Sequence, residues 1–293
     1  MASFQIFNFS FIQIKQPVQA NLFEPTPIYK MSEIWDKKQN ILSDILHNET
    51  LQFHKGAKIY NHQLPFEQDE IYLFKIANNG KIKREINFTI QKEDHNPSCY
   101  VIIDNRHDCQ NIAIQELKKS FSTPNQVANI IEQTLNDKLR EYRLKVTINA
   151  KYSDKDFWVF ANAHPLQIKE VRFHFLPPNI PDYTDALGPV LGISSKEMNG
   201  ALTAQFNADE EDTLTFDENS PLQKKWTQLA GESGKPIEAK LIGSKKIHRI
   251  GANTLIMGEI TDKALQANNE NESNEAEYDA IVLFLNKHRR SNI

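Results

Sequence analysis

The chain has 293 residues, of which 40% are hydrophobic and 25% are charged, and its formal net charge is −4. This composition excludes an intrinsically disordered chain and is typical of a globular protein with one large or two ordinary domains. The acidic balance excludes a basic coat over the whole surface. A local basic face stays compatible with it, because attraction depends on where the charges lie.

The first 14 residues predict a half-buried strand. Phe7, Phe9 and Phe11 alternate with polar residues, which is the period of a strand, and the segment has neither the early basic residues nor the small-residue cleavage site of a signal peptide. Nowhere in the sequence do about 18 apolar residues follow one another, which is the length that a membrane-spanning helix needs. We therefore expect a cytoplasmic protein.

Two helices and five strands are predicted in the rest of the first half. One helix follows Ser32, which can cap it, and the other begins at Thr123, where Pro124 and Gln126 complete a capping box. The sequence Asn78-Asn79-Gly80 is typical of a hairpin turn between two strands. The five predicted strands are Lys58–Leu64, Glu70–Ala77, Glu85–Gln91, Tyr100–Asp104 and Asn111–Gln115.

The second half predicts a further set of strands with two helical stretches. A helical patch is expected around Ser194 and Glu197, and a helix from Ser220 to Gly231. Residues 266–277, rich in Asn and Glu, are expected to form a mobile loop. The predicted strands are Leu144–Tyr152, Phe157–Ala161, Glu170–Leu176, Pro236–Ile242, Lys246–Ile250, Thr254–Thr261 and Ala280–Leu285.

This order of elements predicts an α+β fold of two domains, each a mainly antiparallel sheet with a few packed helices. The expected N-terminal domain covers residues 1–143 and the C-terminal domain covers residues 144–293. Cys99 and Cys109 are expected to be buried thiols, with a disulfide between them as the less favoured reading. The sequence contains no P-loop, dinucleotide-binding glycine pattern or metal-ligand spacing, so we expect neither a cofactor nor a metal ion.

Clustered basic residues predict a surface that contacts phosphates. At the period of a strand, Lys145 and Lys151 fall on one face of their strand, and Arg172 and His174 fall on one face of theirs. If these strands share a sheet, their side chains form a basic inter-domain face that holds nucleic acid by its backbone. The predicted binding residues are Lys145, Lys151, Arg172, His174, Lys245, Lys246 and Arg249, with Lys83 and Arg84 as outlying members.

Two alternative functions stay open at this point. In the first, Asp217, Glu238 and Lys240 form the site of a Mg²⁺-dependent nuclease, since Glu238 and Lys240 fall on the same face of a strand and such a site needs two carboxylates and a lysine. In the second, acidic stretches such as Asp209-Glu210-Glu211-Asp212 bind a basic protein partner, and the chain is an interaction module.

Several segments follow one another in an order that is shared with a known protein family. They are Ile71–Lys75, Lys81–Arg84, Cys99–Ile103, Asn111–Ile114, the helix from Thr123 and, more loosely, Ile237–Leu241. Together they resemble RexA, the phage-exclusion sensor of lambdoid prophages, over most of its N-terminal domain and scattered parts of the second. The resemblance implies a homodimeric, non-enzymatic protein that binds DNA with little sequence preference and acts upstream of a membrane effector. We therefore expect a nucleic-acid-binding sensor component of a bacterial anti-phage defence or exclusion system, with RNA as the alternative ligand.

Overall fold

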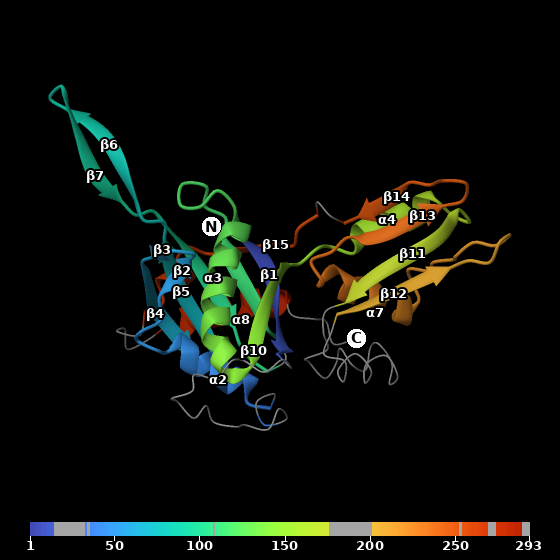
Figure 1. Ribbon diagram of the computed structural model, residues 1–293, viewed down its shortest axis with the longest axis horizontal. Coiled ribbons are helices and arrows are strands. Elements are labelled where there is room, and N and C mark those ends of the chain that lie inside the picture. Colours follow the sequence, from blue (N-terminus) through green and yellow to red (C-terminus); the bar gives the residue numbers. More distant parts are fainter. Residues whose placement is uncertain are drawn as a thin grey trace, which may run out of the picture. The chain divides into compact units, whose positions relative to one another are not determined.

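The computed structural model describes residues 1–14, 33, 36–107, 109–175, 201–251, 254–268 and 274–288. The chain folds into two compact units, shown as a ribbon in Figure 1. The first comprises Met1–Gln5, Gln13–Ile148 and Met257–Arg289, and the second comprises mainly Ile6–Ile12 and Asn149–Ile256. A single boundary at residues 143/144 does not describe this division, because the chain returns to the first unit at Met257. Each unit combines an antiparallel sheet with helices, so the α+β class is confirmed.

The larger sheet has seven strands in the order β10-β1-β9-β8-β5-β4, with β15 also paired to β1. Eight successive residues of β1, from Phe4 to Phe11, are buried, which requires cover on both faces of the sheet. In Figure 1, α3 lies in front of this sheet and α8 lies behind it. The strands are β1 (Ala2–Gln13), β4 (His62–Gln68), β5 (Ile71–Ala77), β8 (Ser98–Asp104), β9 (Asn111–Gln115), β10 (Leu144–Ala150) and β15 (Met257–Ile260).

The helices of the first unit are α2 (Lys38–Leu46), α3 (Pro124–Leu139) and α8 (Glu275–Lys287), and a short hairpin pairs β2 (Phe53–Lys55) with β3 (Lys58–Tyr60). The α3 helix begins where the sequence predicts, with Thr123 at the N-cap and proline following it. The Thr123 side chain makes no capping hydrogen bond, however, so the predicted capping box is incomplete. Cys99 and Cys109 are free and buried, which confirms the prediction of two thiols.

A two-stranded hairpin extends from the first unit (Figure 1). Its strands β6 (Gly80–Ile86) and β7 (Thr89–His95) pair with each other, and the turn lies at Asn87 and Phe88, whose φ angles are 50° and 60°. The predicted strand Glu85–Gln91 is therefore wrong, since the chain reverses within it. The predicted hairpin turn at Asn78-Asn79-Gly80 is also wrong, because the strands on its two sides do not pair with each other. The β5 strand pairs with β4 and β8, and this segment connects the large sheet to the hairpin.

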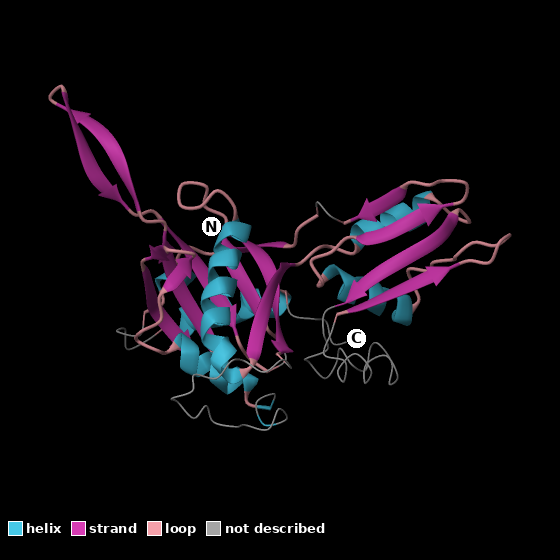
Figure 2. Cartoon of the chain, viewed as in Figure 1, coloured by secondary structure: helices cyan, strands magenta, loops and turns pink. Residues whose placement is uncertain are grey.

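The second unit is built on a four-stranded antiparallel sheet in the order β12-β11-β13-β14 (Figure 2). Its core contains Val171 and Phe173 from the sheet, Phe157 and Trp158 from α4, and Leu229 from α7, so both helices pack on the same face. The elements are α4 (Lys155–Ala163), β11 (Ile168–Phe175), β12 (Leu202–Asn207), α7 (Pro221–Gly231), β13 (Ile237–Leu241) and β14 (Ile247–Ile250).

Two predicted strands are helices. In α4, Phe157, Trp158 and Ala161 are buried while Val159 is exposed, which is the i, i+1, i+4 pattern of a helix face and excludes the predicted strand Phe157–Ala161. The predicted strand Ala280–Leu285 lies within α8, whose buried residues Ile281, Phe284 and Leu285 also have helical spacing. The helix dipole also stabilises α8, because acidic residues lie in its first turn and Lys287 lies in its last turn.

Other predictions fall partly or wholly outside the described residues. Ser32 and the helical patch at Ser194 and Glu197 belong to this group, as do residues 269–273 of the expected mobile loop. The ends of that loop are structured instead: a 3₁₀ helix covers Ala264–Gln266, and α8 begins at Glu275. The α7 helix begins as predicted at Ser220, whose side chain accepts a hydrogen bond from the backbone N–H of Gln223.

Candidate nucleic-acid interface

The face of the small sheet opposite α4 and α7 carries a row of charged side chains. Arg172 on β11 lies directly opposite Glu238 on β13, and Glu238 lies directly opposite Arg249 on β14. Glu238 is 3.7 Å from the Arg172 guanidinium and 3.5 Å from Nε of Arg249. Glu170 pairs with both Arg172 at 2.7 Å and Lys240 at 2.6 Å. The face is therefore an alternating network of ion pairs in which three cations meet two carboxylates.

This network decides how far each cation is available to a ligand. Arg172 also donates from Nε to the side chain of Gln205 at 2.8 Å, so its guanidinium is held by three partners, and its side chain is only 32% exposed. Arg249 contacts Glu238 alone among the described residues, and its side chain is 72% exposed. Of the two arginines, Arg249 can turn toward a phosphate by giving up one partner, Glu238, whereas Arg172 would give up three.

The candidate nuclease residues are engaged in the same network or lie in a turn. Glu238 neutralises two arginines, Lys240 is bonded to Glu170, and Asp217 accepts hydrogen bonds from the backbone and side chain of Asn219 just before α7. Across the residues that the structure describes, no group of three or more His, Cys, Asp or Glu side chains has a metal-binding arrangement. This geometry gives a Mg²⁺ ion no prepared site at Glu238.

His174 lies on the polar face, as its position in the strand predicts, and its Nδ1 is 3.0 Å from the Thr203 hydroxyl. Partial burial lowers the pKa of His174, and the positive charges of Lys235 and Arg172 lower it further. The side chain is therefore a neutral hydrogen-bonding group at neutral pH, and the prediction that it adds positive charge to the face is not supported by its surroundings.

Lys151 is a correction to the predicted binding set. Its side chain is only 4% exposed, and Nζ lies 3.7 Å from the carboxylate of Glu232. The sequence argument carried strand alternation from Lys145 through to Lys151, but β10 ends at Ala150, and Lys151 turns inward. Lys145 is exposed and belongs to the first unit, whereas the other six of the seven predicted residues belong to the second.

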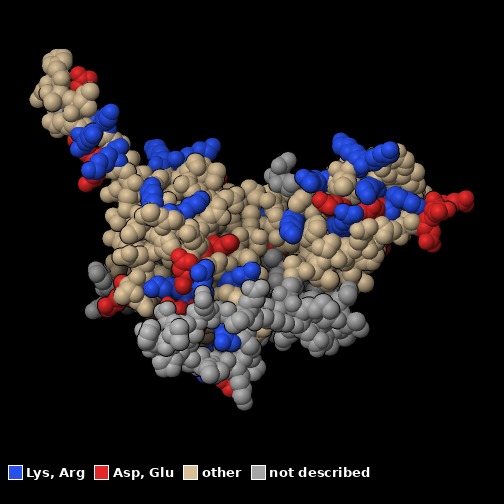
Figure 3. Space-filling model, in the orientation of Figure 1, with Lys and Arg blue, Asp and Glu red and all other residues tan. Residues whose placement is uncertain are grey.

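The exposed cations gather at one edge of the small sheet. Lys245 and Lys246 lie in the connection between β13 and β14, where Gly243 adopts a φ of 69° that lets the chain reverse. Both lysines are exposed, and Arg249 follows them on β14, the last strand in the order of this sheet. Figure 3 shows Lys and Arg side chains over the surface of this unit. Three of the seven predicted residues therefore form one solvent-facing cluster.

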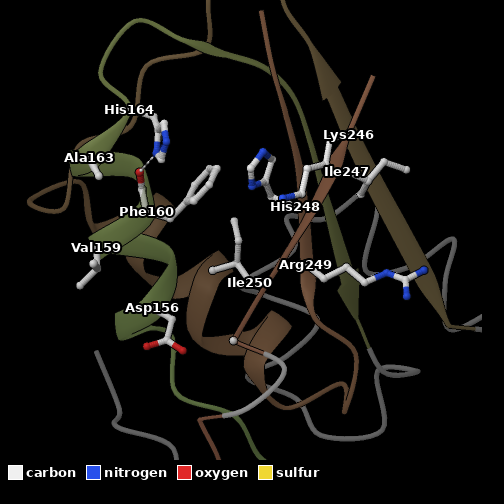
Figure 4. A pocket seen from close by; sticks show the side chains of 11 residues that line it. Asp156, Val159, Phe160, Ala163, His164, Lys246, Ile247, His248, Arg249 and Ile250 are labelled. Carbon is white, nitrogen blue, oxygen red and sulfur yellow. Dashed lines mark hydrogen bonds between the residues drawn. The ribbon is translucent and has the colours of Figure 1, made fainter. Parts of the chain in front are cut away.

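A groove of about 610 Å³ runs between α4 and β14, beside this cluster (Figure 4). Three aromatic rings line it and point toward one another: the centroid of Phe160 is 4.5 Å from that of His164 and 5.2 Å from that of His248. Nδ1 of His164 lies 3.0 Å from the carbonyl oxygen of Phe160, which fixes the imidazole orientation. Lys246 also lines the groove, and Arg249 lies at its border on β14 with its side chain directed to the other face of the sheet (Figure 4).

Sequence reasoning missed the groove because it depends on α4. His164 is one residue beyond the helix and reaches back to Phe160 four residues earlier, which is a helical contact that a strand cannot make. His248 pairs across the sheet with the core residue Ala239, so its ring faces α4, while Arg249 faces the other side. The helical spacing of Phe160 and His164 was the signal that the sequence offered.

Comparisons with known proteins do not assign this site. No protein-family model matches the chain, and no curated protein matches it either. Among the described helices, none combines the length and the apolar character needed to cross a membrane.

Proposed function

We propose that the second unit binds nucleic acid along β14. The phosphates lie against Lys245, Lys246 and Arg249, and unpaired bases stack on the rings of Phe160 and His248 in the adjacent groove. The observation that carries this proposal is the juxtaposition of three exposed cations with a ring-lined groove on a single sheet edge. Proteins that bind single strands without sequence preference combine these two features, because every base has a face that can stack.

The charge balance of the unit is compatible with this function. Lys245 and Lys246 have no ion-pair partner among the described residues, whereas Arg172, Lys240 and Arg249 are paired with Glu170 or Glu238. Phosphate contacts at unpartnered lysines release counterions, so affinity falls steeply with salt and depends little on sequence. In this proposal the protein is a sensor that recognises the phosphate backbone and the exposed bases of a nucleic acid. DNA is the favoured ligand and RNA is the alternative.

The biological setting of the proposal comes from the resemblance to RexA. In that setting the chain is a cytoplasmic, homodimeric, non-enzymatic component of a bacterial anti-phage defence or exclusion system, and nucleic-acid binding is coupled to a membrane effector protein. The binding surface on β14 is independent of this setting and is tested separately.

The test is fluorescence anisotropy with labelled single-stranded DNA, duplex DNA and single-stranded RNA, over about 50 to 200 mM salt. We expect the variant Lys245→Gln/Lys246→Gln/Arg249→Gln to bind at least about 30-fold more weakly at low salt and to reduce the slope of log affinity against log salt by about three. The matched control is Lys224→Gln on α7, which removes an exposed lysine outside the cluster.

The proposal fails if the wild-type chain binds none of the three ligands at low salt, or if the triple variant and Lys224→Gln bind equally well. Plasmid incubation with Mg²⁺ tests the nuclease alternative in the same preparation, and cleavage that Glu238→Ala abolishes would replace the binding proposal with an enzymatic one.

A further inference from the structure

The β6–β7 hairpin is a ribbon with no other strand beside it in the described part of the chain. Each strand pairs only with the other, and six of the seven residues of β7 are exposed. A two-stranded hairpin without a packed face is marginally stable in water. Its length and isolation therefore indicate that it acts by reaching a partner and not by supporting the core of the unit.

The tip of the hairpin holds a phenylalanine, Phe88, in an unfavourable backbone conformation. Asn87 and Phe88 both have positive φ angles, 50° and 60°, which is the geometry of a type I′ turn. Glycine is the favoured second residue of that turn, and a side chain as large as phenylalanine is disfavoured there. Phe88 is also 98% exposed, and Ile90 beside it is 67% exposed. Strain and full exposure of an aromatic ring at one position mark it as a contact for something outside the unit.

The charges behind the tip identify the partner as an anion. Lys83 lies directly opposite Lys92, and like charges in this position destabilise a strand pair. Two nearby cations are neutralised within the hairpin, since Lys81 pairs with Asp94 and Arg84 pairs with Glu93, each at 3.7 Å, whereas the exposed Glu85 forms no ion pair among the described residues. No ion pair forms at Lys83 or Lys92 among the described residues. Figure 3 shows uncharged residues at the end of the hairpin, an acidic side chain next to them, and Lys and Arg side chains nearer the base.

We infer that this hairpin is a second nucleic-acid contact, which inserts Phe88 between stacked base pairs of a duplex while Lys83 and Lys92 contact phosphates at the rim of the groove. The inference rests on the proposed function for its ligand class. Lys83 lies three residues before the end of β6, about 10 Å behind the turn. Because the grooves of duplex DNA are about 8 Å deep, a tip that reaches the base pairs places both lysines at the phosphate-lined rim.

A second copy of this chain is the competing partner for the tip, and the lysine pair argues against it. An apolar tip alone fits a hydrophobic pocket on a protein, but Lys83 and Lys92 project from the same face of the ribbon and need negative charge beside that face. The sugar-phosphate backbone that borders a groove supplies it to both lysines. An apolar side chain that separates adjacent base pairs is a recurring way in which proteins kink a duplex.

The experiment uses the full chain and a duplex that contains a single 2-aminopurine, whose fluorescence rises when its base is unstacked. We expect the wild-type chain to raise this fluorescence and Phe88→Gly to abolish the rise while binding less than about tenfold more weakly. Glycine suits the turn better than phenylalanine, so the hairpin remains folded in this variant. Phe88→Trp, which keeps a ring at the tip, should restore the rise. Leu222→Ala, which trims another side chain that is 61% exposed, should leave it unchanged.

The lysines are tested by the salt dependence of duplex binding. Lys83→Gln/Lys92→Gln should reduce the slope of log affinity against log salt by about two, whereas Lys81→Gln, whose charge Asp94 already neutralises, should change it by less than one. An unchanged fluorescence signal in Phe88→Gly, or an unchanged slope in the double variant, overturns the inference.

The two proposals fail separately in this design. If the β14 triple variant loses binding while the hairpin variants keep the wild-type fluorescence rise and salt slope, the β14 interface is supported and the hairpin inference is overturned. If the β14 triple variant binds normally while the hairpin variants lose the fluorescence rise and the salt slope, the hairpin inference is supported and the β14 interface is overturned. Light scattering measures whether the tip contacts a second copy of the chain instead. If Phe88→Gly converts a dimer to a monomer and still unstacks the duplex, the tip is a dimer contact and the inference is overturned.

Discussion

Lys151 and Glu232 face each other inside the second unit, with Nζ 3.7 Å from Oε1 and side chains that are only 4% and 11% exposed. Removing one partner of a buried ion pair takes away much of the compensation of the other charge, which costs about 3 to 5 kcal/mol. We therefore expect Lys151→Met to lower the free energy of unfolding by about 3 kcal/mol. Urea unfolding followed by tryptophan fluorescence measures it, because Trp158 and Trp226 belong to this unit.

The double variant Lys151→Met/Glu232→Gln is the control for that prediction. It removes both charges, and we expect it to recover most of the stability lost in Lys151→Met, since a neutral pair avoids the cost of burying a carboxylate whose lysine has been replaced. If the two variants are equally destabilised, packing of the lysine stem and not its charge is what matters at this position.

The ring-lined groove predicts a preference for single strands. Phe160→Leu keeps an apolar side chain but loses the face on which a base can stack, and stacking contributes about 1 to 3 kcal/mol per base. We expect about tenfold weaker binding to single-stranded DNA and almost unchanged binding to duplex. Val159→Ala is the control, because Val159 also lines the groove and has no ring. Equal loss on both ligands in Phe160→Leu would place the stacked base elsewhere.

His47 predicts how stability changes with pH. Its Nδ1 lies 2.8 Å from the carbonyl of Ser43 and its Nε2 lies 2.9 Å from Glu67. The hydrogen bond to Ser43, followed by the attraction of Glu67, raises the pKa of His47 above its ordinary value despite partial burial. A raised pKa means that the folded chain binds the proton more tightly. The stabilisation is therefore fully present below the unfolded pKa, about 6.5, and is lost as the pH rises through the folded pKa.

The measurement for His47 is the difference in unfolding free energy between wild type and His47→Gln. We expect a larger difference at about pH 5 than at about pH 9, because the glutamine cannot take up the stabilising proton. His62 provides a comparison of opposite sign, since burial lowers its pKa and its neutral form is the favoured one in the folded chain. A His47→Gln effect that does not vary with pH would contradict the prediction.

Cys99 should be unreactive in the folded chain. Burial raises the pKa of its thiol to about 12, so about one thiol in ten thousand is ionised at pH 8, and the side chain is only 1% exposed. We expect alkylation by iodoacetamide to occur only after unfolding, with Cys99→Ser as the control for assigning the modified peptide. Rapid modification of Cys99 in the native chain would contradict the burial seen here.

The sequence predicts the large features of the fold because their patterns are unambiguous. The β1 and β9 strands, the α3 helix after Thr123-Pro124 and the α7 helix after Ser220-Pro221 all lie where hydrophobic period and proline position indicate. The α4 helix was missed because the continuous apolar run Phe157–Ala161 suits a buried strand and a helix equally well. Only the packing that buries Phe157, Trp158 and Ala161 together decides between them.

The candidate site shows the same limit. Lys245, Lys246 and Arg249 were predicted correctly as exposed cations, because a short loop next to an edge strand leaves long side chains in solvent. Lys151 was not, since its burial depends on Glu232, a residue 81 positions away in the chain that no local pattern relates to it. The Phe160–His248 contact likewise joins residues whose neighbourhood is created by the fold.

The return of the chain to the first unit at Met257 has a consequence for its synthesis. The β15 strand pairs with β1 through Ala2 and Ile260, and Phe284 of α8 packs its ring on Phe4 at 5.7 Å. The β1 strand thus waits for β15 and α8, which come far later in the chain. The strands β11 to β14 emerge before that contact can form, so the first unit is completed only after the second unit has been synthesised.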